Sequence, residues 1–249
     1  MVHTPRPKKA AELYNKLISL QYTDKSEINK IEWQLRKQRK TAPSDTSTGV
    51  ALLRSLVMQG KADEAHTLAG DLFGYLQEME NQVYLSSIIL FSRLGLFDRV
   101  LSLAPDDLNE WGEDYGALFI QCAWGAGDLQ LLEHFSRHVV DEDRQNFEFI
   151  FASLRDLGLD GHFTNHQKIV NDVMGNSFTE FNAILMPSEE GSELYCSYFV
   201  DADRLERRLL EDKIDDSLIQ YYSEVFSDPM AYSPLVNSVV FDITAHTIR

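Results

Sequence analysis

Residues 59–63 read Gln-Gly-Lys-Ala-Asp, and three later stretches repeat this glycine-centred turn. They are Leu-Gly-Leu-Phe-Asp at 94–98, Trp-Gly-Ala-Gly-Asp at 124–128 and Leu-Gly-Leu-Asp at 157–160. The first glycines of the four turns are Gly60, Gly95, Gly125 and Gly158, at steps of 35, 30 and 33 residues. Each turn lies between two apolar, helix-like segments. A period in this range is typical of stacked helical pairs, because one pair cannot bury its apolar face alone.

Apolar residues at three- and four-residue steps predict a helix on each side of every turn. The predicted pairs are 48–58 with 62–77, 83–94 with 97–103, 115–124 with 128–140, and 144–157 with 164–174. Two further helices are predicted ahead of the first pair, at 10–20 and 28–39, and a polar linker at 40–47 separates them from it.

After residue 177 the pattern changes to short runs of aromatic and branched residues. These runs predict a hairpin of strands at 181–186 and 193–200, helix at 201–213 and 216–226, and a strand at 236–248. We therefore expect a mainly α fold with three regions: a basic N-terminal segment and linker at 1–47, helical repeats at 48–176, and a small α+β unit at 177–249. So small a unit has a thin core, and it should dock on the last repeat or on another subunit.

The repeats at 48–175 resemble the tetratricopeptide-repeat (TPR) superfamily in its broad sense. Gly60, Ala65 and the apolar residues from Leu68 to Phe73 resemble that family's small residue in the first helix, alanine in the second helix and following large apolar positions. The resemblance implies a TPR-like α-solenoid, a right-handed superhelix whose first helices line a concave, protein-binding groove.

Candidate contacts of that groove are polar or aromatic residues on the first helix of each pair, because aromatic residues and arginine make good interface anchors. They are Arg54, Tyr84, Arg93, Tyr115 and Asn146. The alternative for the two tyrosines is that they only pack against the next repeat. The repeats have few lysines, which does not favour the lysine-rich carboxylate clamp of some tetratricopeptide domains.

Charge is distributed unevenly along the chain. The net charge is −16, but residues 1–40 carry +6 and the remaining residues carry −22. An acidic body of this kind repels nucleic-acid phosphates and anionic lipid and favours a basic partner, or one presenting an apolar helix. The basic segment either binds an anion or folds back onto the acidic body, and the charge arithmetic favours the second.

The two cysteines, Cys122 and Cys196, have apolar surroundings, and no apolar stretch follows the basic residues near the N-terminus as in a secretory signal. We therefore expect free, buried thiols and a cytoplasmic protein. The longest apolar run, at 117–124, is too short to span a membrane.

Two histidine pairs have the four-residue spacing that places two imidazoles on one helix face for a metal: His134 with His138, and His162 with His166. Neither pair has the glutamate of a zinc protease motif or a cysteine pair beside it. We expect polar surface histidines, no metal and no cofactor.

An acidic cluster lies in the C-terminal unit, at Glu211, Asp212, Asp215 and Asp216. Carboxylates of this kind serve hydrolases as acid–base pairs or cation ligands. Here no positioned histidine or lysine and no glycine-rich loop accompanies them, so a solvated face is the simpler interpretation, and no catalytic residue is assigned.

The sequence thus favours a non-enzymatic adaptor or regulator that holds a partner protein through a helical-repeat groove and an acidic surface. A second hypothesis is an acidic decoy that inhibits a nucleic-acid-binding protein, its carboxylates standing in for phosphates. A third is a hydrolase that uses the C-terminal acids. A homo-oligomer is compatible with all three, for example through the edge of the C-terminal sheet.

Overall fold

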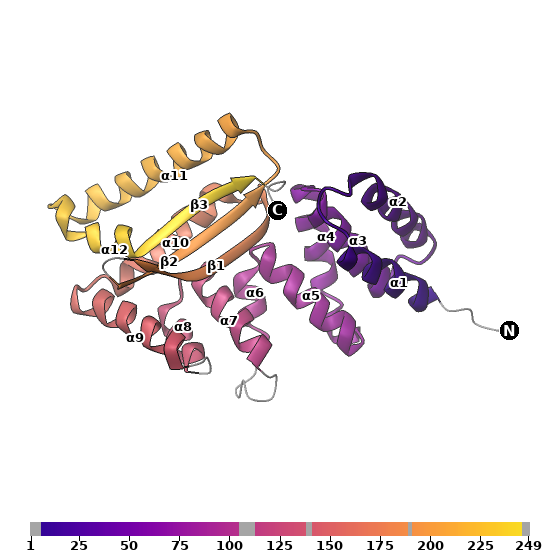
Figure 1. The fold of residues 1–249 in the computed structure, drawn as a ribbon, viewed down its shortest axis with the longest axis horizontal. Helices are drawn as coiled ribbons and strands as arrows, with labels where there is room; N and C mark the ends of the chain where they lie inside the picture. Colours follow the sequence, from indigo (N-terminus) through magenta and orange to yellow (C-terminus); the bar gives the residue numbers. More distant parts are fainter. Residues whose placement is uncertain (1–5, 105–112, 138–140, 189–190, 246–249) are drawn as a thin grey trace.

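A computed structural model describes residues 6–104, 113–137, 141–188 and 191–245, and it is mainly helical with a small three-stranded sheet near the C-terminus (Figure 1). Among these residues no helix is long and apolar enough to cross a membrane.

The N-terminal segment folds as two helices, α1 (Arg6–Ser19) and α2 (Lys25–Thr41), which both pack on α3 (Thr46–Met58). The predicted polar linker is shorter than expected, because helix covers all but residues 42–45 of it. Asp45 begins α3 by capping: its carboxylate accepts hydrogen bonds from the Thr48 amide (3.4 Å) and the Thr48 hydroxyl (2.6 Å).

The predicted helical pairs follow. They are α3 with α4 (Ala62–Phe73), α5 (Asn81–Arg93) with α6 (Phe97–Leu101), α7 (Glu113–Ala126) with α8 (Leu129–Ser136), and α9 (Asp141–Asp156) with α10 (Asp160–Met174). A short 3₁₀ turn, η1 (Leu76–Glu78), follows α4. The mainly helical fold expected from the apolar periodicity is confirmed.

All four turns end the first helix of their pair in the same way. In the third turn, the glycine that does so is not the predicted one. Gly60, Gly95 and Gly158 have φ between 67 and 73°, but the matching residue of the third turn is Gly127 (φ 70°), not Gly125. In each turn the residue after this glycine donates its amide to a carbonyl five residues back, for example Asp128 to Ala123 (2.9 Å). Gly125 instead lies inside α7.

The C-terminal unit is a three-stranded sheet in the order β1-β2-β3. The strands β1 (Phe178–Ser188) and β2 (Gly191–Val200) are antiparallel, and β3 (Val239–Ala245) runs parallel to β2. A parallel pair needs a long crossover, which α11 (Arg204–Val225), η3 (Pro229–Ala231) and α12 (Ser233–Ser238) provide. The helix predicted in two pieces is one helix, opened by a capping box of Asp203 and Glu206.

The sheet docks along the helical pairs, not only on the last one as predicted. Strand β1 contacts α3, α4, α5 and α7, while β2 contacts α9 and α11 contacts α10. Figure 1 shows the sheet between α11 and the helices α7 and α9. Phe181 of β1 packs edge-on against Phe97 (ring centroids 4.7 Å apart), and both are buried. One continuous core therefore joins the helices and the sheet.

Candidate functional site

The five predicted contact residues do not form one site among the described side chains. Arg54 lies over the ring of Tyr14 (5.6 Å to its centroid), and Tyr84 is half-buried against the core. Arg93 pairs with Glu180 of β1 (Nη1–Oε1 3.8 Å). Tyr115 and Asn146 belong to α7 and α9, but their side chains lie outside the part that the structure describes.

The pairing of Arg93 belongs to a contact that fixes β1 on the helices. Glu180 is buried and accepts a hydrogen bond from the Tyr22 hydroxyl (2.9 Å). Burial raises the pKa of Tyr22 to about 12, and the Glu180 carboxylate adds to the effect. Nearby, His66 and Gln121 donate to the Phe178 and Phe181 carbonyls (3.0 and 2.8 Å). Tyr22, α4 and the C-terminal parts of α5 and α7 thus hold the chain's own strand.

Helix α3 is the centre of the N-terminal half, and a groove lies on each side of it. Nearly all of its residues are buried. It contacts α1 and α5 on one side and α2 and α4 on the other. The groove between α1 and α5 has a volume of about 580 Å³ and is mostly apolar, with Tyr14, Ile18, Val50 and Val83 in its lining.

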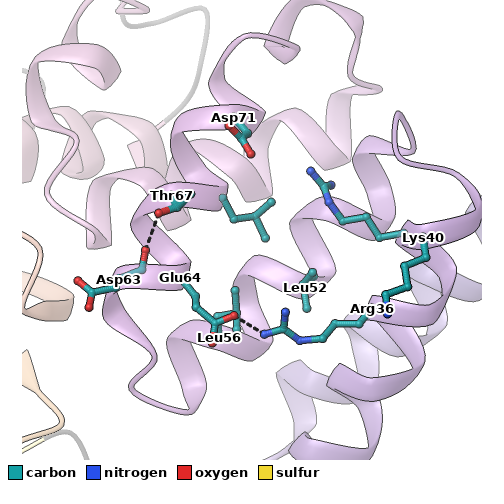
Figure 2. Close-up of a pocket in the computed structure, with 10 residues that line it drawn as sticks. Arg36, Lys40, Leu52, Leu56, Asp63, Glu64, Thr67 and Asp71 are labelled. Atoms are coloured by element: carbon teal, nitrogen blue, oxygen red, sulfur yellow. Dashed lines mark hydrogen bonds and ion pairs between the residues drawn. The ribbon is translucent and has the colours of Figure 1, made fainter.

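The groove between α2 and α4, here named the charged groove, has a volume of about 590 Å³ (Figure 2). Three leucines on α3 and α4 form its apolar floor: Leu52, Leu56 and Leu68. One wall is basic and comes from α2, with Arg36, Arg39 and Lys40. The other wall comes from α4 and is acidic, with Asp63, Glu64, Thr67 and Asp71. Each wall collects one sign of charge because residues three or four positions apart share one face of a helix. The bases of α2 and the acids of α4 have this spacing.

A buried carboxylate orders one end of the charged groove. Glu32 accepts hydrogen bonds from Arg36 Nε (2.6 Å), Lys61 Nζ (2.7 Å) and Gln59 Nε2 (2.6 Å). Burial raises the pKa of Glu32, but the hydrogen bonds from Lys61, Arg36 and Gln59 outweigh it and hold that pKa below its ordinary value. Arg36 also pairs with Glu64, which joins the two walls. This pair links the basic segment to the acidic body.

The rest of the charged groove is open to a ligand. Arg39, Lys40 and Asp71 form no ion pair with any residue that the structure describes. In Figure 2, Arg36 and Glu64 meet across one end, while Asp71 and Lys40 lie away from that pair on opposite walls. The groove can thus offer an apolar floor, free cations and a free carboxylate to one bound segment.

Replacing Glu32 with glutamine should lower the free energy of unfolding by about 1 kcal/mol, since a neutral amide cannot replace the charged acceptor of three donors. The loss stays modest because Arg36 and Lys61 are partly exposed and can turn to water. Urea denaturation measures it. Glu27→Gln on the same helix is the control, because the Glu27–Lys16 pair is exposed and should matter less. Equal losses in the two variants would contradict the role given to Glu32.

The charged groove lies outside the predicted binding surface, which comprised only the first helix of each pair. Its walls are α2, which precedes the predicted pairs, and α4, the second helix of the first pair. The signal was present as bases at 36, 39 and 40 and acids at 63, 64 and 71, at helical spacing. All but residue 40, which was predicted in the linker, belong to regions predicted as helix, but the packing of 28–39 beside the first pair was not predicted.

His166 departs from the expectation of a surface position, whereas His134 agrees with it. His134 is exposed, whereas His166 is buried, and its Nδ1 lies 2.7 Å from the Tyr222 hydroxyl of α11. His138 lies outside the described residues. Across the described ranges, no group of three histidine, cysteine or acidic side chains is arranged to hold a metal ion.

The two thiols are not activated as nucleophiles, and one carboxyl of the acidic cluster has a raised pKa. Cys122 and Cys196 are free and buried, as predicted, and burial raises the pKa of each to about 12. On α11, partial burial and the neighbours Asp212 and Asp216 raise the pKa of Asp215. A thiol or carboxylate in these settings is stabilised in its neutral form.

Comparison of the chain with protein-family models, with curated proteins and with solved structures gives no match. The assignment of a function therefore depends on the geometry of the grooves.

Proposed function

We propose that the protein is a non-enzymatic adaptor or regulator that holds a segment of a partner protein in the charged groove. The observation that carries this proposal is the combination of an apolar floor at Leu52, Leu56 and Leu68 with walls of opposite charge. Small-molecule sites are mostly apolar and enclosed, whereas this groove is open along two helices. An amphipathic helix laid into such a groove buries its apolar ridge and orients itself by its charges.

The walls define the bound segment. Its apolar ridge lies over the leucines, its acidic side chains face Arg39 and Lys40 of α2, and its basic side chains face Asp63 and Asp71 of α4. Binding should weaken with salt, because both walls act through charge at a solvent-exposed site.

The test starts with a pull-down from the native host lysate at low and high salt, and the retained partner is then purified and titrated. Arg39→Glu with Lys40→Glu should weaken binding at least about ten-fold, or about 1.4 kcal/mol, because it repels the acidic edge of the segment. Asp71→Lys should do the same at the basic edge. The control is Lys9→Glu with Lys25→Glu, which changes the charge equally at exposed positions outside the groove.

A partner that binds the groove variants as tightly as the unchanged protein would overturn the proposal. A basic, nucleic-acid-binding partner with a steep salt dependence and no response to the groove variants would favour the acidic decoy instead.

A further inference from the structure

Helix α11 has apolar residues on its exposed face as well as on its buried face. Ile214, Leu218 and Tyr222 are buried against the rest of the protein. Leu205, Leu209 and Ile219 are 67%, 60% and 59% exposed. A helix packed on one side of a domain ordinarily has a polar outer face, and clustered exposed apolar residues mark an interaction surface.

Two aspartates lie on the same outer face, and the exposed Arg208 lies at its edge. At 100° per residue, Asp212 and Asp216 project in the same direction as Leu205, Leu209 and Ile219, and they lie between Leu209 and Ile219 along the helix. Both aspartates are exposed. The three apolar residues and the two aspartates are named the α11 stripe, which presents apolar and acidic groups together.

Helix α2 presents a surface of the opposite kind. Trp33 is 64% exposed, and Lys37 Nζ lies 5.4 Å from the centroid of its ring. Lys30 is exposed one turn before Trp33 and pairs with Glu27 of the same helix (3.8 Å). Lys30, Trp33 and Lys37 are named the Trp33 patch, and none of them lines the charged groove. An exposed tryptophan among cations suits a partner surface that is apolar and acidic, and tryptophan is frequent among the residues that dominate binding energy.

The α11 stripe meets this description, but it cannot reach the Trp33 patch within one molecule. Figure 1 shows α2 and α11 toward opposite ends of the molecule's long axis. Nucleic acid and anionic lipid would be repelled by the acidic body, whose net charge beyond residue 40 is −22. We propose that the Trp33 patch of one copy binds the α11 stripe of a second copy.

The Trp33 patch is shorter than the α11 stripe and can cover only part of it. Lys30 to Lys37 spans seven residues, or roughly 10 Å of helix, and Leu205 to Ile219 spans fourteen residues, or roughly 21 Å. The Trp33 ring packs between Leu205 and Leu209, and Lys37, on one side of the ring, faces Asp212 and Asp216. Two different surfaces meet, so the contact joins copies head to tail, in a chain or ring, or forms twice in a closed dimer.

Sedimentation of the full chain over a wide range of protein concentration, at low and high salt, tests the proposal. The unchanged protein should self-associate, and salt should weaken the association. Trp33→Glu and Leu209→Lys should each weaken it at least about ten-fold, because each places a like charge in the contact. Both residues are exposed, so the fold should survive. Tyr75→Ala, at an exposed aromatic residue elsewhere, should change nothing.

Mixing the two variants gives the decisive result. Trp33→Glu keeps an intact α11 stripe and Leu209→Lys keeps an intact Trp33 patch, so an equimolar mixture should form a complex that neither variant forms alone. The pair Lys37→Asp with Asp212→Lys should associate better than either change by itself. A monomer at every concentration, self-association that survives either variant, or a mixture that stays monomeric would each overturn the proposal. None of these changes touches the charged groove, so its partner binding is tested separately.

Discussion

Acidification from pH 6.5 to about 4 should remove about 3 kcal/mol of folding stability through one residue, His166. Burial lowers the pKa of this imidazole from 6.5 to about 4, because the charged form loses its hydration inside the protein. Within this window the unfolded chain binds a proton that the folded protein does not. The stabilisation is therefore fully present above pH 6.5 and is lost as the pH falls toward 4.

The double variant His166→Leu with Tyr222→Phe isolates this effect. It replaces both partners of the 2.7 Å hydrogen bond with apolar groups, so its stability at neutral pH should lie within about 1 kcal/mol of the unchanged protein. The change also removes the Nε2 atom of His166, which has no hydrogen-bond partner among the described residues. Denaturant titrations at several pH values should then show a much smaller slope between pH 6.5 and 4.

His66 contributes to the residual slope in that variant, since burial lowers its pKa as well, and so do carboxylates with a lowered pKa such as Glu32. A stability of the unchanged protein that does not vary with pH in this window would contradict the prediction. So would a double variant that keeps the full slope, because the proton would then be taken up elsewhere.

The burial of His166 was not predictable from its own segment. The four-residue spacing of His162 and His166 indicates only that the two side chains share a face of α10. That face is covered by Tyr221 and Tyr222 of α11, which lie more than fifty residues later in the chain. Local periodicity reveals which residues share a face, whereas the packing of distant elements decides whether the face meets water or protein.

The position of β1 limited the prediction of contact residues in the same way. Arg93 was predicted to face a partner, and its place near the end of α5 follows from the sequence. Its pairing with Glu180 depends on where the sheet docks, and no local pattern encodes that. Most helices, three of the four turn glycines and the hairpin, in contrast, were predicted well, because capping residues, glycine and apolar spacing act within a few residues.

The correct glycine of the third turn can be identified from the local sequence. The helix after Gly60, Gly95 and Gly158 begins two residues beyond the glycine, and α8 begins two residues beyond Gly127. Aligned on the start of the second helix, the four turns are separated by 35, 32 and 31 residues, which is more even than with Gly125. The sequence Trp-Gly-Ala-Gly-Asp therefore contains one turn glycine, Gly127, and one glycine inside a helix, Gly125.

A side chain at Gly125 should destabilise the protein. Gly125→Ala should lower the free energy of unfolding by about 2 kcal/mol. An added Cβ would lie 2.3 to 2.6 Å from ring atoms of Phe97. The ring cannot move aside easily, because it is buried and packs edge-on against Phe181 of β1. The overlap thus strains the contact that docks the sheet on the helices.

Gly116→Ala in the same helix is the matched control, and its sign should be opposite. A Cβ at Gly116 meets nothing within 4 Å, so the variant should gain up to about 1 kcal/mol from the better helix propensity of alanine. Chemical denaturation of the two variants beside the unchanged protein measures both effects. Two stabilised variants would contradict the prediction, because helix propensity would then outweigh the overlap and the Phe97 ring would have to yield to a methyl group. Opposite signs would show that close packing of α7 against Phe97, not turn geometry, requires a glycine at position 125.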